Sequence, residues 1–99
     1  MSVPAAGTRA QLALLTRAYC HLCDTMRDAL MPIARRHGAT VVEFDVDADP
    51  ALEAAYGDFV PVLLLGDVAD GAVLCHFHLD RDRVVDALAG NPPAQAGGA

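Results

Sequence analysis

The stretch Gln11-Leu12-Ala13-Leu14-Leu15-Thr16, followed shortly by Cys20-His21-Leu22-Cys23, decides the fold of this chain. The first six residues are an apolar run bounded by polar residues, which is typical of a short buried strand. The two cysteines stand where this strand gives way to a helix, so they can close a disulfide across one helical turn. The positive end of the helix dipole favours the thiolate of the first cysteine. The same spacing also suits half of a zinc site, so redox chemistry and metal binding both remain open here.

A helix is predicted directly after the cysteines, from Cys20 or His21 to His37. Its apolar side chains recur at helical spacing, and Gly38 is a natural stop. Pro32 removes one backbone hydrogen bond inside the span, so we expect a kink there. The apolar positions are Leu22, Met26, Leu30 and Ile33.

Five further elements follow along the chain. Period-two alternation predicts a strand over Thr40–Val46, and Asp49-Pro50 is a strong helix start for a short helix through Tyr56. Strands are predicted over Val60–Leu65 and Ala72–His78, and Asp80 is expected to cap a last helix. In the fourth strand the alternation places Cys75, Phe77 and Leu79 on one face, and Leu74, His76 and His78 on the other.

The element order β-α-β-α-β-β-α predicts an α/β fold with a four-stranded mixed sheet flanked by helices. A strand–helix–strand opening requires a parallel pair, and the later hairpin adds an antiparallel strand. The 99 residues form one small domain. We expect the domain to span residues 11–89, with residues 1–10 and 90–99, rich in Gly, Pro and Ala, as flexible tails.

Composition narrows the function classes. The formal net charge is −6 and the seven basic residues, all arginines, are scattered, so neither nucleic acid nor an anionic membrane is expected as a partner. The chain shows no apolar span of membrane length and no signal-peptide pattern, so we expect a cytoplasmic monomer. In a reducing compartment paired thiols indicate redox chemistry or metal ligation, because structural disulfides are rare there.

The element order and two motifs together resemble the thioredoxin superfold, and specifically its small glutaredoxin-like proteins with a Cys-His-Leu-Cys motif. Residues 16–23, Thr-Arg-Ala-Tyr-Cys-His-Leu-Cys, resemble the active-site loop of that family. Phe59-Val60-Pro61-Val62 resembles its second hallmark, the cis-proline loop that faces the cysteines. The likeness covers residues 11–89, the whole predicted domain.

The resemblance implies a role for each matching residue. Cys20 would be the nucleophile and Cys23 the resolving thiol, while Arg17 and His21 would add positive potential near the Cys20 sulfur. Tyr19 belongs to the same loop and would contact substrate or tune the thiols. The Val60–Pro61 bond would be cis, which lets Val60 present its backbone N–H and C=O to a bound thiol.

Glutathione is one candidate co-substrate by the same resemblance. Asp80 stands where the family carries an aspartate that holds the glutamyl end of glutathione. The stretch Cys75-His76-Phe77-His78-Leu79-Asp80 lacks the two glycines that precede that aspartate in the family. The pair between the cysteines is His-Leu, where glutaredoxins carry Pro-Tyr or a similar pair. No cofactor beyond the redox-active disulfide is implied.

The remaining cysteine and the histidines are possible metal ligands, so metal binding is an alternative to redox chemistry. Cys75 is expected to be an inert core thiol, because free cysteine is among the most buried residue types. Zinc is not expected as a structural requirement, because only one close cysteine pair exists and Cys75 and His76 point to opposite faces of a strand. The donors considered are Cys20, His21, Cys23, Cys75, His76 and His78.

Two functions follow as hypotheses. The first is a thiol–disulfide oxidoreductase that reduces protein or low-molecular-weight disulfides through Cys20 and Cys23. The second is a non-catalytic module that keeps the fold and binds a partner through its surface, or through a metal held by the same two cysteines. The intact dithiol and the proline loop favour the first.

Overall fold

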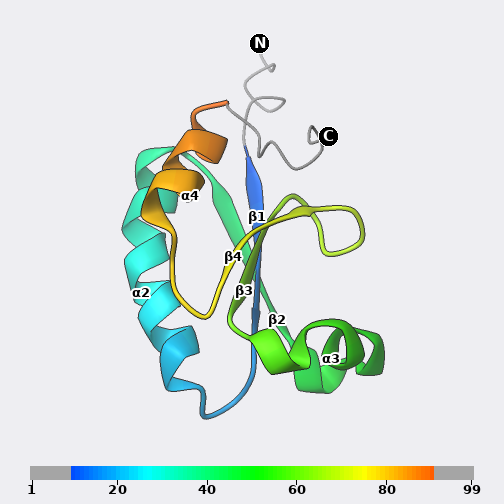
Figure 1. Ribbon diagram of the computed structural model, residues 1–99. Coiled ribbons are helices and arrows are strands. Elements are labelled where there is room, and N and C mark those ends of the chain that lie inside the picture. The colour runs from blue at the N-terminus through cyan, green and yellow to red at the C-terminus, as the bar shows by residue number, and fades with distance from the viewer. Residues whose placement is uncertain (1–9, 91–99) are drawn as a thin grey trace.

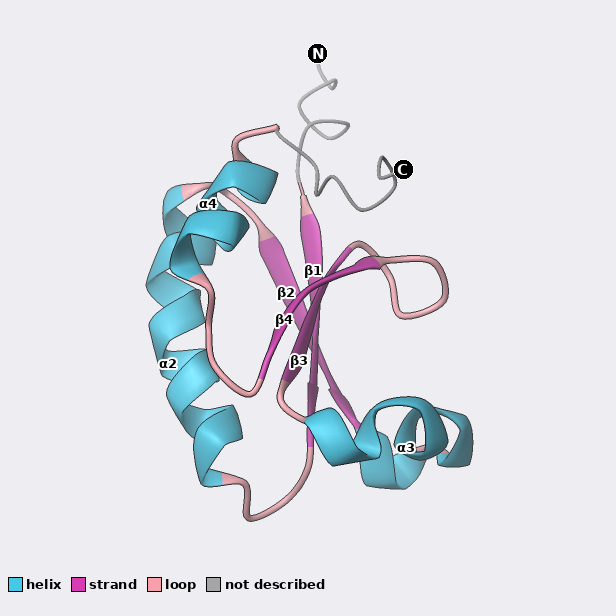
Figure 2. Ribbon diagram, in the orientation of Figure 1, coloured by secondary structure: helices cyan, strands magenta, loops and turns pink. Residues whose placement is uncertain are grey.

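The computed structural model describes residues 10–90, which form a four-stranded sheet with helices on both faces (Figures 1 and 2). The strands are β1 (Gln11–Thr16), β2 (Thr40–Asp45), β3 (Val62–Leu65) and β4 (Ala72–His76). The helices are α2 (His21–Arg36), α3 (Pro50–Tyr56) and α4 (Arg81–Leu88), with single 3-10 turns η1 (Val46–Ala48) and η2 (Gly57–Phe59). The strand order is β2-β1-β3-β4. β1 pairs parallel with β2 and antiparallel with β3, which pairs antiparallel with β4. The predicted mixed α/β sheet is confirmed.

The central strand β1 is buried on both faces and divides the core in two. Leu12 and Leu14 pack against α2 and α4, while Ala13 and Leu15 face the side that α3 covers. These four side chains are fully buried. The short apolar run therefore behaves as the two-sided buried strand that its sequence indicates.

Local signals in the sequence set the helix starts. The Asp49 carboxylate accepts the Ala51 N–H at 2.9 Å, and Pro50 occupies the first helical position of α3. The Asp80 carboxylate accepts the Arg83 N–H at 3.1 Å and caps α4. α2 continues through Pro32 to Arg36, and His37 is its C-cap.

Three predicted strands are shorter in the structure. β2 ends at Asp45, because the Asp45 side chain accepts the Asp47 N–H and turns Val46 into η1. β3 begins at Val62, since the Val60–Pro61 bond is cis and leaves the strand direction. β4 ends at His76, because Phe77 has a φ of 64° and its neighbour His78 donates an N–H back to the His76 carbonyl. This hydrogen bond closes a three-residue turn.

The predicted alternation of faces in β4 is wrong. Leu63 pairs with Cys75 and Leu64 with Val73, so a bulge leaves Leu74 without a partner. Because a bulge adds one residue, Leu74 and Cys75 both contact the core on the α2 and α4 side. Phe77 does not continue the Cys75 face, because its ring lies next to His76.

The predicted flexible tails fall almost wholly on residues 1–9 and 91–99, which lie outside the described residues. Of their inner ends, Ala10 accepts a hydrogen bond from the Thr40 N–H. Within residues 10–90, no helix combines the length and the apolar character that crossing a membrane requires.

Candidate active site

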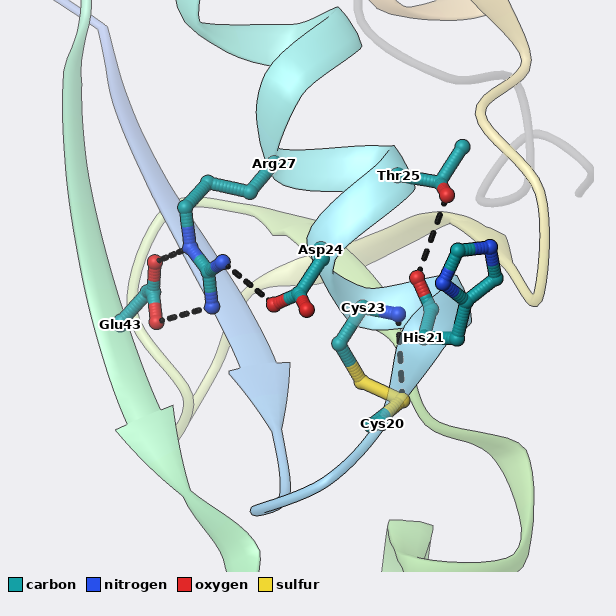
Figure 3. A network of polar contacts seen from close by, with 7 residues as sticks. All are labelled: Cys20, His21, Cys23, Asp24, Thr25, Arg27 and Glu43. Atoms are coloured by element: carbon teal, nitrogen blue, oxygen red, sulfur yellow. Dashed lines mark hydrogen bonds and ion pairs between the residues drawn. A yellow bond between two sulfur atoms is a disulfide. The ribbon is translucent and has the colours of Figure 1, made fainter.

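Cys20 and Cys23 form a disulfide across the first turn of α2, with their Cα atoms 5.2 Å apart (Figure 3). Cys20 is the N-cap of the helix, and its sulfur accepts the Cys23 backbone N–H at 3.1 Å. A sulfur in this position lies at the positive end of the helix dipole. On reduction the same contact would stabilise negative charge on the Cys20 sulfur.

The two cysteines differ sharply in exposure. Cys20 is partly exposed, whereas Cys23 is 1% exposed and belongs to the buried core. Of the two cysteines, Cys20 is therefore the more accessible to an incoming molecule. Cys23 can reach Cys20 but not a substrate that remains in solution.

Arg17 ties the loop before Cys20 to the opposite side of the site. Its guanidinium donates to both carboxylate oxygens of Asp47 at 2.7 and 3.2 Å, to Glu53 at 3.4 Å and to the Gly57 carbonyl at 3.2 Å. The hydrogen bond to Asp47 raises the pKa of Arg17 and lowers that of Asp47. That Arg17 adds positive potential at Cys20 stays a prediction, and the structure shows that its charge is shared with two carboxylates.

A second ionic network lies one turn further along α2 than the disulfide, above it in Figure 3. Arg27 donates to Asp24 at 2.8 Å and holds Glu43 of β2 through two hydrogen bonds. Its pKa is raised chiefly by the hydrogen bonds to Glu43 and then by the one to Asp24. This network joins the start of α2 to the edge strand β2 and pairs Asp24, the acidic residue next to Cys23, with an arginine.

The Val60–Pro61 loop lies at the same end of the sheet as the cysteines. The peptide bond is cis, the geometry that the resemblance implied. In the β1–β3 register Leu15 faces Val62, so the residues after Leu15 run beside those before Val62. The hydrogen bond from Arg17 to the Gly57 carbonyl also joins the segment after β1 to the turn that precedes the proline loop. Figure 1 shows the start of α2 and the approach to β3 at one end of the molecule.

Three predicted site residues have other features in the structure. Tyr19 has a φ of 59° and a fully exposed side chain. His21 is exposed in the first turn of α2, where its carbonyl accepts the Thr25 hydroxyl at 3.1 Å. The Asp80 carboxylate is engaged as the cap of α4, and its role toward glutathione remains a prediction.

Sequence reasoning missed a group of aromatic rings beside the proline loop. Phe59 and Phe77 have ring centroids 6.4 Å apart, and His76 lies 5.7 Å from Phe59 and 4.8 Å from Phe77. The Phe77 N–H donates to the Pro61 carbonyl at 2.9 Å. The only sequence signal was the aromatic character of residues 76–78, which the strand prediction absorbed.

Cys75 is partly buried against the core, not fully enclosed. Burial raises the pKa of its thiol, and a hydrogen bond from the Asp80 backbone partly offsets this. A thiol with a raised pKa is a poor nucleophile near neutral pH. Among residues 10–90 no group of three or more His, Cys, Asp and Glu side chains is placed to hold a metal ion.

Comparison with known proteins places the chain in a family. Residues 11–89 match the model of the glutaredoxin-like domain (DUF836). The chain belongs to this glutaredoxin-like family. An uncharacterized protein of Mycobacterium tuberculosis is 33% identical over 95 residues, which cover 87% of this chain and 94% of that protein.

Solved structures agree with this family. A structural genomics protein from X. campestris is 40% identical, with a TM-score of 0.60 over 79% of this chain and 95% of that one. Protein Ne2328 from Nitrosomonas europaea is 30% identical, with a TM-score of 0.66 over 77% and 87% of the two chains. A mutant thioredoxin from Halobacterium salinarum, 24% identical with a TM-score of 0.65 over 90% and 80%, shows the thioredoxin-like fold alone.

Proposed function

We propose that this glutaredoxin-like protein is a thiol–disulfide oxidoreductase that acts through Cys20 and Cys23. The observation that carries the proposal is the asymmetry of the pair. Cys20 is partly exposed at a helix N-cap and accepts a backbone N–H, while its partner Cys23 is 1% exposed. This arrangement supports an attacking thiolate at the surface and a resolving thiol beneath it.

The proposed reaction transfers two electrons to a substrate disulfide. The Cys20 thiolate attacks one substrate sulfur, the substrate S–S bond breaks, and the other substrate sulfur leaves as a thiolate. Cys23 then loses its proton and attacks the Cys20 sulfur, which releases the second substrate thiolate and forms the Cys20–Cys23 disulfide. A thiol donor, either a low-molecular-weight thiol or a dithiol protein, returns the pair to the reduced state.

The same proposal covers the conditions for this cycle. The chain would need no cofactor beyond its own disulfide, and it would work as a monomer in the cytoplasm, where thiol donors keep the pair reduced. Glutathione is one candidate donor and thioredoxin reductase another.

Three serine variants test the proposal with a chromogenic aromatic disulfide as substrate and a dithiol as donor. Cys20→Ser should abolish turnover. Cys23→Ser should complete one reaction and then accumulate a mixed disulfide on Cys20, detected by mass spectrometry. Cys75→Ser is the matched control and should behave as the wild type. Turnover that survives Cys20→Ser, or a mixed disulfide that forms at Cys75, would overturn the proposal.

A further inference from the structure

A cluster of exposed rings lies against the proline loop, and we name Phe59, His76 and Phe77 the aromatic cluster. Phe59 is 48% exposed and Phe77 39%, although large apolar side chains usually pack into a core. The Phe77 N–H bond to Pro61 fixes the cluster to the loop that borders the cysteines. Exposed apolar groups gathered in this way are typical of a binding surface, and this one lies at the end of the sheet that carries the cysteines.

The cluster opens into a shallow groove of about 230 Å³ between α3 and the β3–β4 hairpin. Its walls are mostly apolar, so it suits an aliphatic or aromatic side chain. The lining residues are Ala55, Tyr56, Phe59, Val62, Val73 and His76. Tyr19 adds a fully exposed ring directly before Cys20.

Acidic side chains border this surface. Asp58 is exposed next to Phe59, and Asp47 and Glu53 lie on the neighbouring η1 and α3. Arg17 offsets part of this negative charge, but its single guanidinium is shared between Asp47 and Glu53. Arg27, the next arginine after the cysteines, is likewise held by two carboxylates. The rim therefore carries net negative charge and favours a cationic partner.

We propose that this surface binds protein disulfides whose cysteine has one apolar and one basic neighbour, in preference to glutathione. The inference rests on the proposed function and names its substrate class. An apolar neighbour would pack on the aromatic cluster and in the groove. A basic neighbour would face the carboxylates and the exposed rings, which attract cations. Glutathione carries two carboxylates and one ammonium group, so the acidic rim repels it.

The test compares two mixed disulfides that share thionitrobenzoate as the leaving group. One joins it to the capped tripeptide Phe-Cys-Arg amide and the other to glutathione. The reduced Cys23→Ser variant attacks each once, and release of the coloured thiolate gives the second-order rate constant. We expect the tripeptide to react about tenfold faster, the size of one aromatic contact together with one exposed cation contact. Added salt should shrink the preference.

Substitutions in this surface then test which residues cause the preference for the tripeptide disulfide over the glutathione disulfide. Phe59→Ala or Phe77→Ala, placed in the Cys23→Ser background, should reduce the ratio of the two rate constants to about threefold or less. Asp58→Asn removes one charge without removing a packed side chain, and should slow the tripeptide and speed the glutathione reaction. Met31→Ala is the matched control, since Met31 is 37% exposed on α2, away from the cluster.

The outcomes separate this inference from the proposed function. Equal rate constants for the two disulfides, or a ratio that none of the cluster variants changes, would overturn the inference and leave the oxidoreductase intact. Absence of thiolate release from both disulfides would contradict the proposed function itself.

Discussion

Tyr19 occupies a backbone conformation that its side chain does nothing to stabilise. Its φ is 59°, and its side chain is fully exposed, so it gains no stabilisation from burial. The left-handed region costs a residue with a Cβ atom about 1–2 kcal/mol, whereas glycine adopts it freely. Glycine in turn loses about 0.4–1 kcal/mol more chain entropy on folding. We therefore expect Tyr19→Gly to stabilise the oxidised protein by about 0.5–1 kcal/mol.

Two matched variants isolate the backbone effect. Tyr19→Ala keeps the Cβ atom and the unfavourable φ, so its free energy of unfolding should stay within about 0.5 kcal/mol of the wild type. Ala18, the neighbour in the same turn, does not have a positive φ. Ala18→Gly should therefore destabilise the protein by about 0.5–1 kcal/mol, the opposite sign to Tyr19→Gly.

Urea denaturation of the three oxidised variants measures the effect as a shift in the midpoint at constant slope. A glycine variant no more stable than the alanine variant would refute the backbone reasoning. An alanine variant that loses more than about 1 kcal/mol would show that the Tyr19 ring makes a stabilising contact. Both Tyr19 variants should react more slowly with the apolar basic tripeptide disulfide, because the ring next to Cys20 is gone.

The remaining predictions concern charge, tuning and packing. The hydrogen bond from Arg17 holds the pKa of Asp47 below its ordinary value of 3.8, so the folded state binds protons less readily there than the unfolded state. The stabilisation is present at pH values above the Asp47 pKa of the unfolded state, and it is lost as the pH falls through the Asp47 pKa of the folded state. The difference in unfolding free energy between wild type and Asp47→Asn should therefore shrink from about pH 6 to pH 3. A difference that stays constant over this range would contradict the prediction. His21→Leu removes a polarised group beside the Cys20 thiolate and should make the reduction potential more negative, and equal potentials would end the tuning hypothesis. Leu30 lies fully buried on the inner face of α2, so Leu30→Ala should cost about 2–5 kcal/mol in denaturant titration, far more than Met31→Ala on the exposed side of the helix.

Local signals made the fold predictable from the sequence. The apolar run of β1, the Asp49-Pro50 start of α3 and the Asp80 cap of α4 are each decided by neighbouring residues, and the structure reproduces them. The cysteine pair and the proline loop were visible for the same reason. Each is a short motif whose meaning depends on a position between two elements.

Long-range pairing decides the features that the sequence did not reveal. The bulge opposite Leu63 and Leu64 depends on how two strands align, so alternation alone placed Leu74 and Cys75 on opposite faces. Arg17 meets Asp47 and Glu53 across 30 and 36 residues of chain, which no local pattern can show. The positive φ of Phe77, which ends β4, occurs beside the Phe77 N–H bond to Pro61, a contact across 16 residues of chain that no local pattern shows.

The two non-glycine residues with positive φ in the described part of the chain both lie at the candidate active site. Tyr19 directly precedes Cys20, and Phe77 is bound to Pro61. Bulky side chains rarely adopt this region, and where they do the conformation is commonly tied to function. Stability alone would favour glycine at position 19, because the exposed Tyr19 ring makes no packing contact that would offset the free-energy cost of its positive φ. Exposed rings with positive φ next to Cys20 and at the proline loop suit a surface that binds substrate side chains, and they link the aromatic cluster to the proposed chemistry of the cysteine pair.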